Sequence, residues 1–389
     1  MNTKLLGYVF TLLGSITSVS CEAQESINQP IKTGADQIES YIKALQDKRV
    51  GLLVNHTSYI EDVHLLDTLT SMGIRIETIF APEHGFRGNH ANGEKVNNEI
   101  DEKTQTPVIS LYGKNKKPTI EQLSNIDVVI YDVQDVGARF YTYISTMSHM
   151  MEACAENGIS MLVLDRPNPN GHYVDGPILK KEFSSFVGLH EVPVVHGMTV
   201  GEYAKMVNGE GWLKNGVQCD LTVIPLENYT HNSEYSLTIR PSPNLPNDKS
   251  INLYPSLGFF EGTIINAGRG TEFQFQRYGA SFFSKSDFSY TPKANFGAKY
   301  PKQKGKLCFG VDLRNTKKLS AINLEWLIDA YQKTPKTEKF FGKTFTIHAG
   351  NTKLQQQIEQ GLTAKEIRKT WQKDITKFKK IRKQYLIYN

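Results

Sequence analysis

The sequence predicts an α/β fold: a Rossmann-like, doubly wound, mostly parallel sheet followed by a smaller α+β domain. In the first half of the chain, short runs of Val, Ile and Leu alternate with helical patterns, as in parallel sheets that are covered on both faces. From about Arg240 the sequence becomes rich in Pro, Asn, Gly and aromatic residues, which indicates a second domain. We therefore place the Rossmann-like domain over residues 32–244, and a C-terminal domain that closes a cleft over residues 245–389.

The elements expected in the first domain follow one another as strand–helix–strand units. After a helix over 35–46, strands are expected over 50–54, 74–80, 108–111, 128–131 and 161–164. Helices are expected over 63–71, 120–123 and 143–156, and a further helix starts after Thr199, with Glu202 at the capping-box position. A long polar loop over 83–106 interrupts the pattern, and loops of this length are often functional.

The second domain is expected to mix strands and helices. Strands are expected over 308–313 and 344–348, and helices over 321–331 and 352–360. The segment 241–256 is so rich in Pro, Asn and Ser that no regular structure is expected there. A final helix is expected over 364–385, because apolar residues recur there at helical spacing. Its many Lys and Arg residues favour a solvated face over a contact with an anionic surface.

The composition is typical of a soluble globular protein. Of the 389 residues, 39% are hydrophobic and 22% are charged, and the net charge of +5 is too small to indicate a nucleic-acid partner. Cys154 and Cys219 are expected to be buried free thiols, which behave as small hydrophobes. We expect no metal and no cofactor, because the His and Asp residues show no HExxH-like spacing and no GxGxxG follows the first strand.

The N-terminus has the features of an export signal. In residues 1–23, Lys4 precedes an apolar run and then small residues, as in a signal peptide. The sequence Ser-Val-Ser that precedes Cys21 is similar to a lipobox, so we expect an exported, periplasmic or membrane-anchored lipoprotein with lipid on Cys21. The alternative is ordinary cleavage near Ala23, which would remove Cys21.

Polar residues directly follow several of the predicted strands. They are His56, Glu83, Tyr112, the segment 132–139 and Asp165. The carboxyl ends of parallel strands share one edge of an open sheet, and ligands bind in the crevice there. We therefore expect five separate stretches to converge on one site, which would suit a polar substrate and acid/base chemistry.

Glu83 is the strongest candidate for a catalytic group. It lies in the motif PEHGFRG, at a strand end that opens a glycine-containing loop. Partial desolvation near Phe86 would let this carboxyl hold a proton near neutral pH and act as a general acid or base. His84 and Arg87 are candidate binding residues in the same loop. The alternative is a Glu83 that only caps the loop or pairs with Arg87.

The segment YDVQDVGARFYTY over 131–143 is the densest group of candidates. Asp132 and Asp135 are candidates for a base or nucleophile, and Gln134 for binding substrate hydroxyls. Arg139 could hold a carboxylate through a bidentate contact, and Tyr143 could stack on a substrate ring. In the alternative interpretation, one acid caps a helix and Arg139 neutralises Asp135.

Further candidates come from rigid loops. In DRPNPNG, two prolines would hold Asp165 and Asn168 in place, unless Asp165 only pairs with Arg166. Asn244 in PSPNLP is a candidate binding residue. The motif GRGT lacks the ending of a phosphate-binding loop, so we expect Arg269 to reach an acidic substrate group across the cleft. Its flanking acids, Glu261 and Glu272, are candidate acids or partners of Arg269.

Together, the motifs PEHGFRG, YDVQDVGARFYTY, DRPNP, HGMTVGE, PSPNLP and GRGT resemble the bacterial exo-β-N-acetylmuramidase family, the NamZ-type glycoside hydrolases. The resemblance covers nearly the whole chain from about Val50. It implies a catalytic Rossmann-like domain, a cleft against the C-terminal domain, and Glu83 as the principal catalytic carboxylate. One departure is that EGT is followed by Ile264-Ile265-Asn266 and GRGT by EFQF, which affects the C-terminal wall rather than the reaction.

The implied reaction releases terminal β-linked N-acetylmuramic acid from the non-reducing ends of peptidoglycan fragments of the MurNAc-GlcNAc type. Glycoside cleavage needs a proton for the leaving oxygen and a second group at the oxocarbenium-like centre. Asp132, Asp135 or the acetamido group of the substrate could supply the second function. The lactyl carboxylate of the substrate would give Arg87, Arg139 or Arg269 a role in the cleft. The alternative function is a non-catalytic envelope lipoprotein that binds muropeptides in the same cleft.

Overall fold

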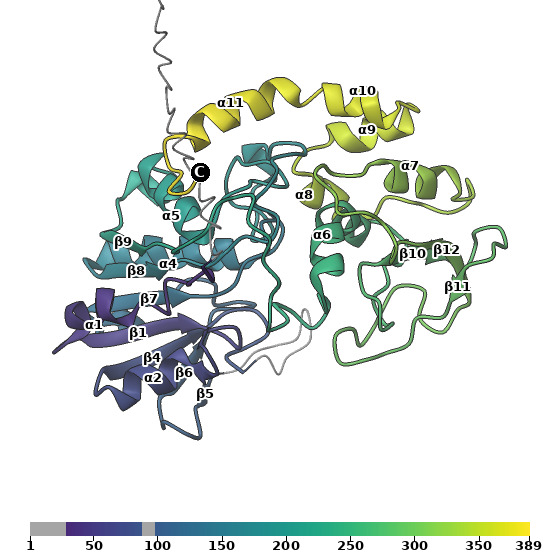
Figure 1. The fold of residues 1–389 in the computed structure, drawn as a ribbon. Coiled ribbons are helices and arrows are strands. Elements are labelled where there is room, and N and C mark those ends of the chain that lie inside the picture. The colour runs from purple at the N-terminus through teal and green to yellow at the C-terminus, as the bar shows by residue number, and fades with distance from the viewer. Residues whose placement is uncertain (1–28, 88–97) are drawn as a thin grey trace, which may run out of the picture. The chain divides into compact units, whose positions relative to one another are not determined.

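A seven-stranded sheet forms the centre of the first part of the chain (Figure 1). The computed structural model describes residues 29–87 and 98–389, and Ile31–Asn389 form one unit. The strands are β1 (Arg49–Val54), β4 (Arg75–Ala81), β5 (Glu99–Ile100), β6 (Pro107–Ser110), β7 (Val128–Asp132), β8 (Ser160–Leu164) and β9 (Leu221–Ile224), in the order β5-β6-β4-β1-β7-β8-β9. Only the β5–β6 pair in this sheet is antiparallel, which confirms the predicted doubly wound, mostly parallel sheet.

Alternate residues along the strands enter two different hydrophobic cores, as the two-residue period of a strand requires. Leu52 and Ile130 belong to the core that includes α1 (Ile38–Leu45) and α2 (Leu65–Ser71). Leu53 and Tyr131 belong to the opposite core, which includes residues of α3 (Ile120–Leu123), α4 (Tyr143–Asn157) and α5 (Val200–Gly209). Helices therefore cover both faces of the sheet. The predicted cap of α5 is also confirmed, because Thr199 and Glu202 form a capping box.

The order of the strands reverses between β1 and β7, which creates a crevice at their carboxyl ends. Val54 lies opposite Asp132 at this edge. Glu83 follows β4 on one side of the crevice, and the segment 133–143 follows β7 on the other. Two of the five predicted strand-end stretches thus flank the switch point of the sheet.

The C-terminal part combines a small antiparallel sheet with helices. Its strands β10 (Arg277–Ala280), β12 (Cys308–Asp312) and β11 (Ser289–Tyr290) pair in that order. The helices are α6 (Asp248–Leu257), α7 (Glu325–Gln332), α8 (Phe345–Ala349), α9 (Lys353–Glu359), α10 (Ala364–Lys369) and α11 (Gln372–Arg382). Shorter elements are the hairpin β2 (Tyr59–Ile60) and β3 (Val63–His64), and the 3-10 helices η1 (Lys181–Phe183), η2 (Lys214–Gly216) and η3 (Gly258–Gly262).

The expectation of irregular structure over 241–256 was wrong for its second half, which forms α6. Asn247 caps this helix through a capping box with Ser250. Pro255 lies inside α6 and cannot donate to the carbonyl of Ile251, but Asn170 Nδ2 donates to that carbonyl at 3.0 Å instead. The Asn170 side chain, from the first part of the chain, thus replaces the helical hydrogen bond that Pro255 cannot make.

The predicted strand over 344–348 is instead the helix α8. Phe345 is fully buried, with its ring centroid 4.5 Å from that of Phe341, and it lies directly against Gly262. A Cβ atom at Gly262 would come within 2.4 Å of the Phe345 Cα. Gly350 then ends the helix in the left-handed region, with φ 77°. Tertiary packing therefore overrides the alternation of polar and apolar residues over 344–348, which is typical of a strand.

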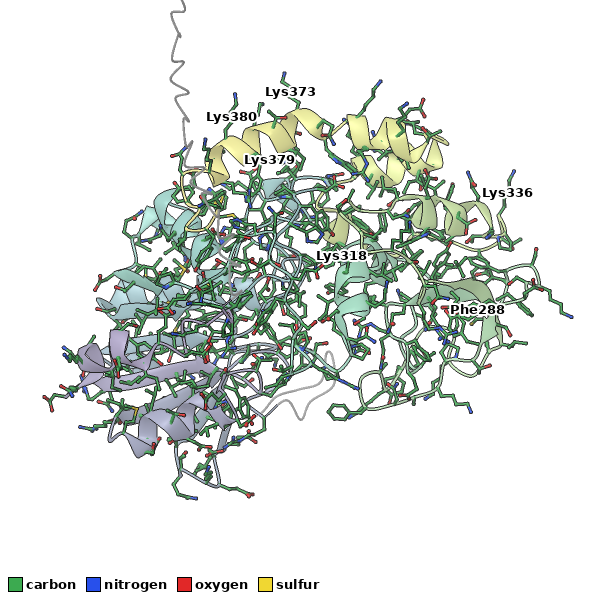
Figure 2. All side chains as sticks on the ribbon, viewed as in Figure 1. Phe288, Lys318, Lys336, Lys373, Lys379 and Lys380 are labelled. Atoms are coloured by element: carbon green, nitrogen blue, oxygen red, sulfur yellow. The ribbon has the colours of Figure 1, made fainter. Side chains whose placement is uncertain are left out.

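The predicted final helix is broken into α10 and α11. Thr370 turns its hydroxyl back to the carbonyl of Ile367 at 2.8 Å, and the indole of Trp371 donates to Asp175 Oδ1 at 3.1 Å. Side-chain bonds of this kind compete with the backbone ladder of a helix. Lys373, Lys379 and Lys380 on α11 are exposed and point outward, as predicted for a solvated face (Figure 2).

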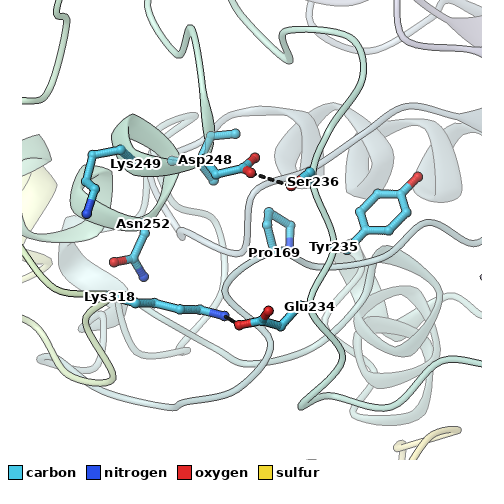
Figure 3. A pocket seen from close by; sticks show the side chains of 9 residues that line it. Pro169, Glu234, Tyr235, Ser236, Asp248, Lys249, Asn252 and Lys318 are labelled. Carbon is cyan, nitrogen blue, oxygen red and sulfur yellow. Dashed lines mark hydrogen bonds and ion pairs between the residues drawn. The ribbon is translucent and has the colours of Figure 1, made fainter. Parts of the chain in front are cut away.

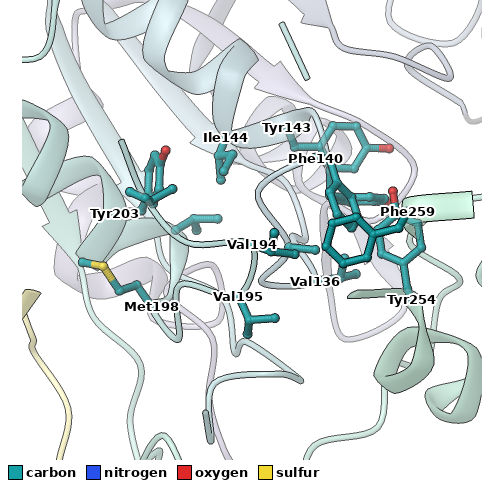
Figure 4. Packing of buried hydrophobic residues seen from close by; sticks show 14 of the residues in the cluster. Val136, Phe140, Tyr143, Ile144, Val194, Val195, Met198, Tyr203, Tyr254 and Phe259 are labelled. Atoms are coloured by element: carbon teal, nitrogen blue, oxygen red, sulfur yellow. The ribbon is translucent and has the colours of Figure 1, made fainter. Parts of the chain in front are cut away.

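Aromatic side chains join the two parts of the chain (Figure 4). Phe140, from the segment after β7, packs edge-to-face on Tyr254 of α6, with ring centroids 5.2 Å apart, and also on Phe259 of η3 at 6.1 Å. A Cβ atom at Gly258 would lie 2.4 Å from the Phe140 ring, so glycine permits this close approach. The division at residues 244 and 245 stays a prediction, because one continuous core spans it.

The predicted signal peptide, Cys21 and His90 lie outside the described residues. Among residues 29–87 and 98–389, no helix is both long and apolar enough to cross a membrane. Cys154 and Cys219 are buried free thiols, as predicted, although Cys219 precedes β9 rather than lying in it.

A buried ion pair holds the carboxyl edge of the sheet together. Asp132 is fully buried at the end of β7, and its two oxygens accept from Arg166 Nε and Nη2 at 2.5 and 2.8 Å. Arg166 also donates to the carbonyl of Tyr59 in the β2–β3 hairpin at 3.1 Å. The alternative Asp165–Arg166 ion pair is therefore not observed, because the guanidinium reaches Asp132 on the neighbouring strand.

Replacing Arg166 with Met is expected to lower the free energy of unfolding by about 3–5 kcal/mol, because it leaves the charge of Asp132 buried without its partner. Urea denaturation followed by circular dichroism measures this change. The control is Arg49→Met, which removes an arginine from a half-exposed pair with Asp127 and should have a far smaller effect. Equal losses in the two variants would contradict the proposed importance of the buried pair.

Candidate active site

A cavity of about 290 Å³ opens at the carboxyl edge of the sheet, where the two parts of the chain meet. The lining from the first part is Glu83, His84, Tyr112, Phe140, Tyr141, Thr142, Tyr143, Phe186 and Val187. The remaining lining is Ser242 and Asn244, at the end of the first part, and Leu245, Tyr254, Glu261, Arg269, Phe275 and His348 from the second part. Its volume is close to the lower end of the ~300–1,000 Å³ that is usual for small-molecule sites. The cavity therefore suits one small, polar group rather than a long polymer.

Glu83 enters the cavity from a tight turn after β4. The Gly85 N–H donates to the carbonyl of Pro82 at 3.0 Å, and both His84 and Gly85 have positive φ, at 73° and 78°. A non-glycine residue in the left-handed region costs conformational energy, and such strain clusters at functional sites. The Glu83 side chain is only 8% exposed.

Two hydroxyl groups orient the Glu83 carboxylate. Thr142 Oγ1, at the N-cap position of α4, donates to Glu83 Oε2 at 2.8 Å. Tyr112, from the segment after β6, is also hydrogen-bonded to Glu83, and burial together with this carboxylate raises the pKa of its phenol. Residues from three strand ends thus meet at one carboxyl group.

The loop that carries Glu83 is locked by its next residues. Phe86 is buried and packs edge-to-face on His64, with ring centroids 5.0 Å apart. Arg87 lies over the Phe86 ring at 4.3 Å and donates to Asp101 Oδ1 at 2.6 Å. Arg87, a predicted binding residue, therefore holds the loop and does not line the cavity. The alternative pairing of Arg87 with Glu83 is not observed.

Asp132 and Asp135, the predicted candidates for a second catalytic group, both lie outside the cavity lining. Asp135 accepts from the Gly137 N–H at 2.6 Å, and burial raises its pKa to about 7. Gln134 donates to the carbonyls of Asp135 and Pro167 at 2.8 and 2.7 Å. The geometry gives these three residues the task of holding loops, and neither acid caps α4.

Asp165 and Asn168 are also buried within the protein. Asp165 Oδ2 accepts from Thr199 Oγ1 at 2.7 Å and from Tyr388 at 2.6 Å, and burial raises its pKa to about 6. Asn168 donates to the carbonyl of Met198 at 2.8 Å and accepts from the Asn170 N–H at 2.8 Å. The predicted rigid DRPNP loop is therefore observed, but Asp165 and Asn168 do not line the cavity.

Arg139 is fully buried and joins the two parts of the chain. Its Nη1 donates to the carbonyls of Pro177 and Val192 at 2.8 Å each, and its Nη2 donates to the carbonyl of His348 at 2.9 Å. Burial lowers its pKa to about 9. The alternative contact with Asp135 is not observed. Because three main-chain carbonyls occupy its terminal nitrogens, Arg139 positions the cavity wall.

Among the predicted binding residues, Tyr143 and Asn244 line the cavity, whereas His56 does not. His56 Nε2 lies 2.8 Å from the carbonyl of Arg240, and burial lowers its pKa. Tyr143 donates to the carbonyl of Pro241 at 3.2 Å. Asn244 Nδ2 donates to the carbonyl of Gly297 at 2.7 Å, and its Oδ1 has no partner among the described residues. That buried oxygen is an acceptor for a ligand hydroxyl or N–H group.

The second part of the chain contributes an ion pair to the cavity. Arg269 Nε donates to Glu261 Oε1 at 3.0 Å, so the predicted pairing of these two residues is confirmed. Burial opposes ionisation of Glu261, but the charges of Arg269 and Lys302 outweigh it and lower the pKa of this carboxyl. His348 faces the same cavity, and its pKa is lowered by burial.

Sequence reasoning missed several lining residues. Thr142 carried a signal, because it lies in the 131–143 segment, whereas Tyr112 was already expected at this edge from its place after a predicted strand. Tyr254 and His348 carried none, since their elements, α6 and α8, were predicted incorrectly.

A second cavity of about 210 Å³ lies between the DRPNP loop and α6 (Figure 3). Its charged groups pair with one another: Lys318 Nζ lies 3.5 Å from Glu234 Oε1, and Ser236 donates to Asp248. These pairs leave less unpartnered polar surface for a ligand than the cavity at Glu83 offers. In the part of the chain that the structure describes, no group of three or more His, Cys, Asp or Glu residues is placed to hold a metal ion.

Comparisons with known proteins agree with this architecture. Residues 50–249 match the family described as exo-beta-N-acetylmuramidase NamZ, N-terminal, and residues 252–388 match its C-terminal counterpart. The peptidoglycan beta-N-acetylmuramidase NamZ of Bacillus subtilis (strain 168) is 39% identical over 411 residues, which cover 97% of each chain. Two crystal structures of DUF1343 family proteins from Bacteroides fragilis NCTC 9343 have TM-scores of 0.86 and 0.82 at 46% and 29% identity, and each comparison covers 92% of this chain and 99% of the other. Because the matches span both parts of the chain, this protein belongs to the NamZ family.

Proposed function

We propose that this protein is an exo-acting glycoside hydrolase that releases terminal β-linked N-acetylmuramic acid from the non-reducing ends of peptidoglycan fragments. The observation that carries the proposal is a buried carboxylate, Glu83, in a small polar cavity of a chain that belongs to the NamZ family. A cavity of this size accommodates a terminal sugar better than an internal stretch of a glycan, which supports exo action.

We assign the role of general acid/base to Glu83. Cleavage of a glycoside needs a proton delivered to the leaving oxygen, and a carboxyl group that is largely shielded from water is suited to this task. The Thr142 hydroxyl fixes one carboxylate oxygen at 2.8 Å, which restricts the rotation of the side chain. The strained turn at His84 further fixes the direction in which Glu83 points.

For the second catalytic function, the cavity lining favours Glu261, which the sequence offered only as a candidate acid or partner of Arg269. Glu261 is the other carboxylate in the cavity lining, and its pKa is lowered by Arg269 and Lys302 despite its burial. An ionised carboxylate stabilises an oxocarbenium-like centre or polarises an attacking acetamido group. We therefore place this function on Glu261 and the acetamido group of the substrate rather than on Asp132 or Asp135.

Uncharged polar groups and aromatic rings complete a sugar site. Asn244 Oδ1 is a buried acceptor without a partner among the described residues, and a sugar hydroxyl or acetamido N–H would satisfy it. Phe140, Tyr143 and Tyr254 provide aromatic surface in the same lining. This mixture of a few polar groups with aromatic walls is typical of small-ligand pockets.

The Glu83→Gln variant is expected to lose at least about 100-fold in kcat on a chromogenic β-N-acetylmuramoside, because the amide cannot transfer the proton. The free N-acetylmuramic acid released from a β-muramosyl disaccharide is the decisive product to measure. Binding of N-acetylmuramic acid, followed by calorimetry, should change little, since the amide keeps the shape of the side chain.

The matched control is Glu272→Gln, at an exposed glutamate near the GRGT motif and outside the cavity lining. This variant should retain full turnover. Wild-type protein that binds the disaccharide but releases no sugar would overturn the hydrolase and favour a muropeptide-binding protein. A fully active Glu83→Gln variant would overturn the role of Glu83 alone.

We further propose that the protein is exported and anchored to a membrane through a lipid on Cys21. The basic, apolar and small-residue sequence that precedes this cysteine supports the proposal.

Replacing Cys21 with Ser is expected to move most of the protein from the membrane fraction to the soluble fraction, because the diacyl anchor is lost. Immunoblotting of fractionated cells measures this shift, and Cys154→Ser is the control, since that thiol is buried in α4. A mature N-terminus located after Ala23 by mass spectrometry would contradict lipid anchoring.

A further inference from the structure

We infer that Arg269 binds the free lactyl carboxylate of N-acetylmuramic acid and thereby selects this sugar over N-acetylglucosamine. This inference rests on the proposed function and adds to it the residue that recognises the distinguishing group of the substrate. The two sugars differ only in the lactyl ether, so selection between them requires a group that responds to its negative charge.

Among the described residues, the charges of the cavity leave one residue for this task. The lining includes the carboxylates Glu83 and Glu261, and Arg269 is its one Arg or Lys residue among the described part of the chain. Two carboxylates repel an anionic substrate unless a cation is placed beside its charge. His348 contributes little, because burial lowers its pKa.

The other arginines suggested by the sequence are already engaged. Arg139 uses its terminal nitrogens on three main-chain carbonyls, and Arg87 is paired with Asp101. Lys302 lies close to Glu261, but its ammonium group donates to the carbonyls of Phe260 and Glu261 at 2.6 and 2.8 Å. None of these three cations lines the cavity.

The GRGT turn holds Arg269 rigidly in place. Gly268 and Gly270 both have positive φ, at 81° and 78°, and a Cβ atom at either would come within 2.5 Å of a main-chain oxygen. Asn266 clamps the turn: its Nδ2 donates to the Arg269 carbonyl at 3.0 Å, and its Oδ1 accepts from the Gly268 N–H at 2.7 Å. A preorganised cation loses little conformational entropy when it binds its ligand.

The Arg269 guanidinium keeps hydrogen-bond donors that no described residue uses. Its Nε donates to Glu261, and no described residue accepts a hydrogen bond from its two terminal nitrogens. Phe275 lies under the guanidinium, with the ring centroid 5.1 Å from Cζ, and the Arg269 side chain is 16% exposed. Two terminal N–H groups match the two oxygens of a carboxylate, as in bidentate pairs. Glu261 thus orients the guanidinium, and the lactyl group completes its hydrogen bonds.

The test compares 4-nitrophenyl β-N-acetylmuramoside with 4-nitrophenyl β-N-acetylglucosaminide, which lacks the lactyl group. In Arg269→Gln, KM for the muramoside is expected to rise about 10- to 100-fold, the range for loss of a bidentate charge-assisted contact. The KM for the glucosaminide should stay within about threefold of wild type, whereas kcat should fall by a similar factor for both substrates, because Arg269 also lowers the pKa of Glu261. Arg269→Lys should recover part of the affinity, because it keeps the charge but loses the bidentate geometry.

A second measurement changes the ligand instead of the protein, so its result does not depend on whether the variants fold. Wild-type protein should bind N-acetylmuramic acid at least about tenfold more tightly than its lactyl methylamide, which has nearly the same shape but no charge. Calorimetry on the wild-type protein measures both ligands without turnover, because neither free sugar contains a glycosidic bond. Arg314→Gln, at an exposed pair with Asp312, is the control and should leave the preference unchanged.

The outcomes separate this inference from the proposed function. If wild-type protein cleaves the muramoside but Arg269→Gln changes KM for both substrates by the same factor, Arg269 only supports Glu261 and the inference is wrong. Equal affinity for the acid and its methylamide also overturns it. If wild-type protein cleaves neither substrate, the hydrolase proposal fails, whereas a preference for the acid over the methylamide still supports Arg269 as the carboxylate site.

Discussion

The architecture of the candidate site depends on the burial of one guanidinium. Arg139 is 1% exposed, and no carboxylate of residues 29–87 or 98–389 accepts a hydrogen bond from it, so main-chain carbonyls stabilise its charge. Those carbonyls come from Pro177, Val192 and His348, which lie far apart in the sequence. A buried charge without such partners would cost several kcal/mol, so the three segments are held together by this requirement. The residues that follow Arg139 immediately form the wall of the cavity.

Close packing around Arg139 makes this arrangement specific. A Cβ atom at Gly350 would lie 2.7 Å from Arg139 Nη2, and one at Gly188 would lie 3.2 Å from its Cδ. Phe140 then packs on Tyr254 and Phe259 from the second part of the chain. Polar and aromatic contacts therefore act at the same junction, and they place Glu83 from one part in the same cavity as Glu261 and Arg269 from the other.

The strand ends could be predicted from the sequence because parallel strands buried on both faces appear as continuous apolar runs. The edge on which Glu83 lies followed directly from that pattern. The roles of the polar residues at this edge could not be predicted from the sequence. Asp132 and Glu83 both lie at the end of a strand, and only the fold shows that Arg166 neutralises Asp132. Tyr254 and His348 were missed since tertiary contacts, rather than local preference, determine α6 and α8.

The last residues of the chain show that the two parts are interdependent. The Tyr388 hydroxyl donates to Asp165 at the end of β8, and the Ile387 and Tyr388 N–H groups donate to Glu202 at 2.9 and 3.3 Å. Residues 387 and 388 thus donate hydrogen bonds to two buried acids of the first part of the chain, Asp165 and Glu202. A fragment that lacks residues 387 and 388 would lose these hydrogen bonds to Asp165 and Glu202, so the first part of the chain depends on the second for its native structure.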